Sequence, residues 1–287
     1  MSQFDVYQMI TDRLVAMLED GTAPWGKPWT GGSDPANLVS RREYSGINYF
    51  LLACSSYSSP YWLTYKQAQD LGGHVRKGEK GTPVIFWKIL EKKNATGEES
   101  GEKVPLLRYY TVFNAEQCEG IKVPDACAAT HHNDPIDAAE AVQLAMPNRP
   151  IVTIGGARAF YSPARDSVTV PEMARYKHPE AYYSTLFHEL GHSTGHETRL
   201  NRPGVAEQHF FGDAEYSREE LVAEMAAAFL CGHCGIESAV IENSAAYLQS
   251  WIKALRGDKK LAITAAAQAQ KAADYILNRK AAQADDE

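Results

Sequence analysis

The sequence has few cysteines and no long apolar run, and both absences narrow the class of protein. Its five cysteines are an odd number at irregular spacing, whereas small secreted domains carry even sets that form disulfide frameworks. No apolar stretch approaches the roughly 20 residues that a membrane-spanning helix requires, and the acidic, amphipathic start over residues 1–18 is unlike a secretory signal peptide. We therefore expect a cytoplasmic protein without a membrane partner.

A strong positive charge, which is common in nucleic-acid-binding proteins, is also missing, because the formal net charge is −7. Residues 41–93 differ from the rest, with nine Lys and Arg against four Asp and Glu. A local basic segment favours binding of polyanions more than the total charge opposes it. The distribution of charge is therefore compatible with a nucleic-acid-binding surface in the first part of the chain.

The texture of the sequence predicts an α+β fold in two parts. Residues 1–125 begin with a helix over 4–19 and continue as short apolar runs punctuated by Gly and Pro, which predicts a short helix over 65–71, strands over 82–87 and 108–113, and a hairpin connection over 92–101. Residues 126–136 have the composition of a linker. Residues 137–287 are predicted to be mainly helical, with helices near 135–146, 180–193, 217–231, 243–256 and 259–280 and strands over 151–154 and 165–170.

The segment His188-Glu189-Leu190-Gly191-His192 has the HExxH spacing of a metal-dependent hydrolase. Residues four apart share one helical face, so both imidazoles can reach one ion. Glu189 lies beside the ion, where it can take a proton from activated water, so it is the candidate catalytic residue. Gly191 costs about 1 kcal/mol inside a helix, which indicates that another element packs closely against it.

A catalytic zinc needs a third protein ligand. The metzincin pattern requires a histidine where this chain has Thr198, so that class fails. His196 follows His192 by four residues and is a minor alternative. Glu220 and Glu224 share a helical face, and their spacing resembles the ExxxD element of the glutamate-zincins. By that resemblance Glu220 is the third ligand and Glu224 orients a ligand histidine, although the two roles can be exchanged. The set His188, His192 and Glu220 suits Zn²⁺ and also accepts Mn²⁺, cobalt or nickel.

Two weaker patterns lie near the predicted metal site. The alternation of polar and apolar residues over 165–170 is typical of an edge strand, along which a peptide substrate could be bound. Cys231 and Cys234 have the spacing of a redox or zinc pair. They end an apolar helix and have no second pair, so two buried thiols are the preferred interpretation.

Aromatic residues stand next to cations throughout the first part of the chain. Single-stranded nucleic acid is held by aromatic faces that stack on bases and by cations that follow phosphates. Most of the rings must fill the core of a domain of this size, and roughly a third are expected to line a groove. The candidate DNA-binding residues are Trp25, Lys27, Trp29, Arg41, Arg42, Tyr44, Tyr49, Trp62, Lys66, Arg76, Lys77, Lys80 and Lys88.

Taken together, these motifs resemble the ArdC antirestriction family over nearly the whole chain. The first part carries Tyr44-Ser45-Gly46-Ile47-Asn48 and the run from Gly72 to Gly81, and the second carries HELGH and the segment 219–224. The resemblance implies a single-strand-binding domain at 1–125, a linker at 126–136 and a glutamate-zincin-like metallopeptidase domain at 137–287. The Cys231 and Cys234 pair is a departure that we do not expect in the family.

The resemblance also implies a biological role. The protein would be encoded on a conjugative plasmid or similar mobile element, bind incoming single-stranded DNA, and protect it from host restriction. A protein in the host restriction machinery is a possible substrate of the metal site. Two alternatives stay open: a single-stranded-DNA-binding protein whose zincin domain is not proteolytic, and a general metallopeptidase whose aromatic domain recognises polypeptide.

Overall fold

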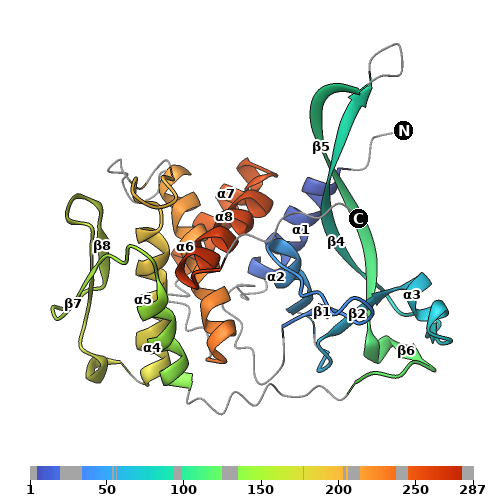
Figure 1. Ribbon diagram of the computed structural model, residues 1–287, viewed down its shortest axis with the longest axis horizontal. Coiled ribbons are helices and arrows are strands. Elements are labelled where there is room, and N and C mark those ends of the chain that lie inside the picture. Colours follow the sequence, from blue (N-terminus) through green and yellow to red (C-terminus); the bar gives the residue numbers. More distant parts are fainter. Residues whose placement is uncertain are drawn as a thin grey trace.

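The computed structural model describes residues 5–19, 34–53, 55, 57–93, 99–124, 135–176, 178–202, 205, 214–236 and 245–279. It confirms the predicted α+β class, with strands gathered in the first part of the chain and helices in the second (Figure 1). Within those ranges, none of the helices is both long and apolar enough to cross a membrane. The predicted domain limits at 125 and 137 stay predictions, because residues 125–134 lie outside the described ones.

In the described residues of the first part of the chain, three α-helices accompany a four-stranded and a two-stranded sheet. The helices are α1 (Val6–Glu19), α2 (Ile47–Ala53) and α3 (Tyr65–Asp70), and the strands are β1 (Ala36–Asn37), β2 (Tyr61–Thr64), β3 (His74–Val75), β4 (Thr82–Lys93), β5 (Glu99–Asn114) and β6 (Cys118–Glu119). The main sheet has the order β1-β2-β5-β4, and β3 pairs with β6. Among these described strands, β1 and β2 pair in parallel and the other pairs are antiparallel. Sequence reasoning predicted α1 and α3 but missed α2.

The β4 and β5 hairpin is longer than the sequence predicted. Pairing continues from Thr82 and Val112 to Lys93 and Glu99, with an irregularity between Glu91 and Lys93. The prediction of a connection over 92–101 was therefore wrong at both ends. Charge and glycine lower strand propensity, but backbone hydrogen bonds extend an antiparallel ladder whatever the polarity of its side chains. The hairpin projects from the body of the molecule in Figure 1.

Asn48 on α2 fixes the free edge of β4. Its side-chain amide donates to the carbonyl oxygen of Ile85 at 2.7 Å, and its side-chain oxygen accepts from the Ile85 amide at 2.8 Å. The asparagine thus imitates one residue of a neighbouring strand and satisfies two buried backbone groups. One role of the motif over 44–48 is therefore to hold the sheet.

The described residues of the second part include five α-helices and a three-stranded sheet. The helices are α4 (Pro135–Ala145), α5 (Pro179–Ser193), α6 (Ala214–Cys234), α7 (Ala245–Gly257) and α8 (Leu261–Ile276), and the strands are β7 (Ile151–Ile154), β8 (Phe160–Ser162) and β9 (Ser167–Val170). The sheet order is β7-β9-β8. The strand predicted at 165–170 is therefore central, and the prediction that it is an edge strand was wrong. Sequence reasoning missed the short β8, whose pairing occupies the second side of β9.

One hydrophobic core joins helices from both parts of the chain. Ile10 and Leu14 of α1 belong to the same cluster as Trp251 of α7, and Figure 1 shows α1 and α2 beside α7 and α8. The rings of Phe50 on α2 and Phe229 on α6 lie 4.7 Å apart between centroids. The helix that carries the acidic residues of the predicted site is therefore packed against the first part of the chain.

Candidate metal centre

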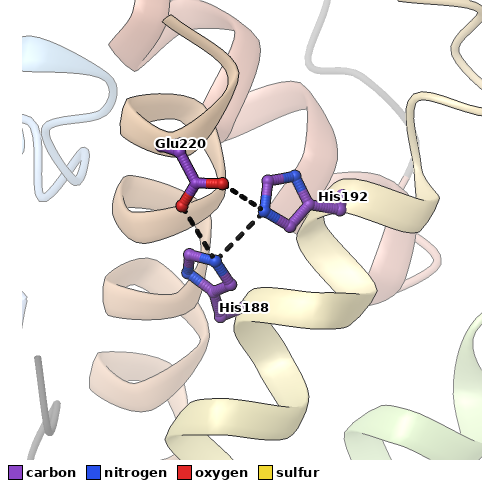
Figure 2. Close-up of side chains that lie close together, drawn as sticks. All are labelled: His188, His192 and Glu220. Atoms are coloured by element: carbon purple, nitrogen blue, oxygen red, sulfur yellow. Dashed lines mark hydrogen bonds and ion pairs between the residues drawn. The ribbon is translucent and has the colours of Figure 1, made fainter. Parts of the chain in front are cut away.

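Helix α5 carries the HExxH residues, and the residues at its two ends favour a helix that begins and ends where this one does. Pro179 occupies the first turn, where a missing amide hydrogen is harmless, and Glu180 lies in the same turn, where a carboxylate favours the helix dipole. The helix ends at Ser193, and the hydroxyl of Thr194 donates to the carbonyl of Gly191 at 2.7 Å. His188 and His192 are four residues apart, so they share one face of α5. This face is turned toward α6 (Figure 2).

Gly191 allows α5 and α6 to approach closely. A Cβ atom at this position would lie 3.3 Å from the Cα atom of Ala223 and 3.5 Å from the Cβ atom of Ala226. The glycine therefore faces a row of alanines on α6, as its presence inside a helix predicted. This close approach brings the carboxylates of α6 within reach of the histidines of α5.

Three side chains converge at the contact between the two helices. The Nε2 atoms of His188 and His192 lie 3.1 Å apart. Each Nε2 atom is 3.5 Å from one carboxylate oxygen of Glu220, so the carboxylate spans both rings (Figure 2). One ligand atom from each residue lies within 4.8 Å of the others. These three residues form a candidate site for one divalent metal ion.

Each histidine has a second carboxylate behind it. The Nδ1 atom of His188 is 3.6 Å from Glu224, and the Nδ1 atom of His192 is 3.3 Å from Glu219. A carboxylate behind the ring favours the proton on Nδ1 and leaves the Nε2 lone pair directed at the centre of the site. Sequence reasoning assigned this role to Glu224 but missed Glu219, for which the only signal was an acid immediately before Glu220.

The electrostatics of the cluster favour a cation at its centre. Burial opposes protonation of both histidines, but the carboxylates around them outweigh burial and raise the pKa of His188 and, more strongly, of His192. Burial also opposes ionisation of Glu220, yet the two imidazoles lower the pKa of its carboxyl group well below the usual range. Burial raises the pKa of Glu224 to about 7.

The donor set fits a metal ion. Two Nε2 lone pairs and a carboxylate are all acceptors, so at contact distance they repel one another unless a proton or a metal lies among them. His188 Nδ1 is, within the described residues, a buried atom without a hydrogen-bond partner. A small shift of the ring would bring it within hydrogen-bonding reach of Glu224, which is the orientation that metal-binding histidines commonly have.

The structure also places the remaining candidates. Glu224 faces the back of the His188 ring instead of the convergence point, and His196 hydrogen-bonds through Nδ1 to the Thr198 hydroxyl at 2.9 Å. His196 is outside the converging group, so its alternative assignment as a ligand is not supported. Glu189 is buried on α5 between the two histidines, and its catalytic role stays a prediction. Cys231 and Cys234 both carry buried thiols, as predicted.

Glu220→Ala is expected to weaken Mn²⁺ binding more than Glu224→Ala does. Loss of an orienting carboxylate costs roughly 10- to 100-fold in metal affinity, and loss of a direct ligand costs more. The dissociation constants can be measured by counting free Mn²⁺ with electron paramagnetic resonance, and the metal-free melting temperature of each variant serves as the control. Unchanged binding by Glu220→Ala would transfer the ligand role to Glu224.

Comparison with known proteins agrees with this architecture. Residues 139–268 match a family described as a zincin-like metallopeptidase, and residues 4–113 match the N-terminal domain of the anti-restriction factor ArdC. The crystal structure of antirestriction ArdC from plasmid R388 in its metal-free form is 39% identical, superimposes with a TM-score of 0.78, and covers 96% of this chain and 100% of its own. The chain belongs to the ArdC antirestriction family.

The chain matches other relatives over very different shares of their own length. The Mn(II)-bound structure of R388 ArdC is 37% identical, has a TM-score of 0.76, and is matched over 96% of this chain and 98% of its own. Two Escherichia coli proteins named DNA primase TraC are 38% identical over 94% of this chain, which spans only 27% and 20% of their lengths. An uncharacterised protein, y4eC of Sinorhizobium fredii, is 33% identical over 95% of this chain and 91% of its own length.

Three of the predicted DNA-binding aromatics in the ArdC-type first part are core residues. Trp62 is 1% exposed and packs edge-on against Tyr57. Tyr44 is buried in the same small cluster, and Tyr49 is buried against Phe229. Because base stacking needs an accessible ring face, the prediction that these three bind DNA was wrong. Trp25, Lys27 and Trp29 lie outside the described residues.

The predicted cations of the ArdC-type first part are mostly exposed. Arg41, Arg42, Lys66, Arg76, Lys77 and Lys80 are accessible, and Lys88 lies on β4 with its side chain outside the described ones. Arg41 lies over the ring of Tyr61 at 5.0 Å. Arg76 forms an ion pair with Glu79 at 2.7 Å, which reduces its availability for phosphate. Their contact with DNA stays a prediction.

The hairpin presents an aromatic surface whose residues were not among the candidate DNA-binding residues predicted from the sequence. Phe86 and Tyr110 are 45% and 47% exposed, and their rings meet edge to face with centroids 5.6 Å apart. Arg108 is exposed and pairs directly with Phe86 across the ladder. We call these three residues the aromatic face. Arg108 and Tyr110 alternate along β5 onto the side of the sheet that holds the buried Val112, so the alternation gave no signal that this side is exposed farther along the hairpin.

Proposed function

We propose that this ArdC-family protein binds single-stranded DNA through the aromatic face and carries a metal-dependent peptidase site at His188, His192 and Glu220. The protein would be supplied by a conjugative plasmid or similar element and would protect incoming DNA from restriction in the cytoplasm. The observation that carries the peptidase proposal is the convergence of the two Nε2 atoms and the Glu220 carboxylate at one point. Its partners would be single-stranded DNA and a peptide substrate, for which a protein of the host restriction machinery is the candidate.

The metal proposed for the site is zinc, with manganese as the alternative. Two histidines and one glutamate are a usual set for catalytic zinc, and they leave a coordination position open. The related R388 ArdC has been crystallised with Mn(II), which supports a site that accepts more than one divalent ion. When bound, such an ion supplies Lewis acidity toward a peptide carbonyl and a water molecule.

The residues of this chain would supply the remaining chemistry. Glu189 follows His188 on α5, so its carboxylate lies beside the site and can accept a proton from the attacking water and pass it to the leaving amine. Glu224 and Glu219 would hold the two histidine rings in the orientation that directs Nε2 toward the site. Burial of the cluster excludes most water, which strengthens these electrostatic interactions.

The aromatic face supports the single-stranded-DNA proposal. Bases stack on exposed rings with little sequence preference, and a neighbouring arginine can contact the phosphate backbone or stack on a base. Phe86, Tyr110 and Arg108 provide both chemistries on one face of a projecting hairpin. The hairpin also extends away from α5 and α6 (Figure 1), so DNA on it would leave these helices accessible.

Transfer of a plasmid into a restricting host tests the proposal as a whole. Recipients expressing the wild-type protein are expected to accept the plasmid more efficiently than recipients without it, and Phe86→Ala with Tyr110→Ala is expected to remove that advantage. Recipients that lack the restriction system provide the control, because there the protein should make no difference.

A Glu189→Gln protein in the same transfer assay separates the two halves of the proposal. Protection that survives this change intact would show that peptide hydrolysis is not the protective mechanism. If protection survives the combined Phe86→Ala and Tyr110→Ala change, DNA binding by the aromatic face does not account for protection.

A further inference from the structure

Arg202 connects the end of α5 to the acidic start of α6. Its guanidinium donates to both carboxylate oxygens of Glu219, from Nε at 3.1 Å and from Nη2. Nη2 also donates to the carbonyl of Gly191 at 2.9 Å, and Nη1 donates to the hydroxyl of Thr194. The residue is only 6% exposed. A planar fork that engages both oxygens fixes the plane of a carboxylate, which a single donor cannot do.

The carboxylate that Arg202 fixes is the one behind His192. Glu219 Oε1 lies 3.3 Å from Nδ1 of His192, whose Nε2 atom faces the convergence point. A guanidinium, a carboxylate and an imidazole thus form a chain that leads to the candidate metal position. Each member restricts the next, so the orientation of His192 depends on a residue that does not itself reach the site.

The segment after α5 is shaped to return Arg202 to this place. The Leu200 amide donates to the carbonyl of Thr194 at 2.9 Å, and the Arg202 amide donates to the carbonyl of Gly195 at 3.0 Å. Asn201 adopts a left-handed conformation with φ of 47°, which asparagine tolerates better than most residues. A Cβ atom on Gly195 would lie 2.3 Å from Val205 and 3.2 Å from Arg202 Nη2, so a glycine is required for the segment to fold back.

The charges around the site show why a cation is needed there. Glu189, Glu219, Glu220 and Glu224 are gathered around two imidazoles in a buried place. A divalent ion offsets only part of that charge, and uncompensated buried carboxylates are unfavourable. Arg202 supplies a positive charge on the side away from the convergence point, where it does not compete with a metal for ligands.

We propose that Arg202 is a positioning residue for the metal ligand His192, acting through Glu219. This inference rests on the proposed metal function of the site. Arg202→Lys keeps the positive charge and loses the fork, so it isolates geometry from charge. Weakening of an orienting interaction of this kind reduces metal affinity by roughly 10- to 100-fold, and we expect a loss of that size for Mn²⁺.

Arg199 offers a matched control on the same segment. Its side chain is 1% exposed, against 6% for that of Arg202, donates to the carbonyl of Ser193 at 2.7 Å, and forms an ion pair with Asp166. Its described contacts do not include a carboxylate behind a ligand histidine. Arg199→Lys and Arg202→Lys should therefore both lower the metal-free melting temperature, but Arg199→Lys should leave Mn²⁺ affinity near that of the wild type.

The experiment titrates each full-length protein with Mn²⁺ and counts the free ion by electron paramagnetic resonance. Mn²⁺ binding by Arg202→Lys within about twofold of Arg199→Lys would overturn the positioning role alone. Failure of the wild type to bind Mn²⁺ or Zn²⁺ would overturn the proposed metal function together with this inference. If Arg202→Lys does not fold, Glu219→Gln replaces it in the test. This change disrupts the same contact from the carboxylate side and should reduce Mn²⁺ affinity by the same amount.

Discussion

Glu189→Gln is expected to lower peptide hydrolysis by roughly 100- to 10,000-fold, the range that a general base contributes. Glutamine has nearly the same shape as glutamate but cannot accept a proton from water near neutral pH. The assay uses the protein loaded with Zn²⁺ or Mn²⁺ and fluorescein-labelled casein as an unselective probe. Because Glu189 lies beside the converging ligands and is not one of them, the variant should still bind metal.

Two control measurements distinguish loss of the catalytic base from loss of metal or of folding. Mn²⁺ affinity within a few-fold of the wild type and an unchanged melting temperature would show that the loss of hydrolysis is chemical. Equal hydrolysis by the wild type and Glu189→Gln would remove the base role from Glu189. Absence of hydrolysis by the metal-loaded wild type on casein and on an unbiased peptide library would favour a zincin domain without peptidase activity.

Phe86→Ala combined with Tyr110→Ala is expected to weaken binding of an oligothymidine strand by roughly 30-fold or more. Stacking of a base on an aromatic ring contributes about 1–3 kcal/mol, and the two rings contact each other, so their contributions need not add. Fluorescence anisotropy with a labelled strand measures the change. Duplex DNA of the same length should bind more weakly than the single strand, because its bases are not available to stack.

Phe160→Ala is the matched control for this pair. Phe160 is 49% exposed but lies on β8, in the second part of the chain. Its removal should leave DNA affinity unchanged. Arg108→Ala should weaken binding and reduce the dependence on salt by about one ion. Equal affinity of the double variant and the wild type would show that DNA uses another surface, and the exposed cations over 66–80 would then be the next candidates.

The centre of the metal site could be predicted from local sequence. The spacing of His188 and His192 defines one helical face. Gly191, inside the same helix, predicted that another element packs closely against it, and that element is α6. Glu220 followed from its resemblance to a known acidic element. Glu219 and Arg202 could not be found in this way, because their contact is made only when the segment after α5 folds back against α6.

Which aromatic residues reach solvent could not be read from the sequence. Trp62 and Phe86 both stand in an aromatic and basic segment, yet one is a core residue and the other is half exposed. Trp62 on β2 is buried in a cluster with Leu52 of α2 and Val84 of β4, whereas Phe86 lies farther along β4, outside that cluster. Short elements such as α2 and β8 were missed for a related reason, since they are stabilised by tertiary partners and carry little periodic signal of their own.

The shared core has a consequence for how this molecule can be divided. Helix α1 buries Ile10, Leu14 and Leu18 in the cluster that contains Trp251 and Leu255 of α7, and the Thr11 hydroxyl donates to the carbonyl of Lys259. A chain truncated before the second part would expose an apolar surface that has evolved to be covered, and such surfaces promote aggregation. Point substitutions can therefore test the function proposed for each part separately, whereas removal of the first part would leave the second part without some of its core.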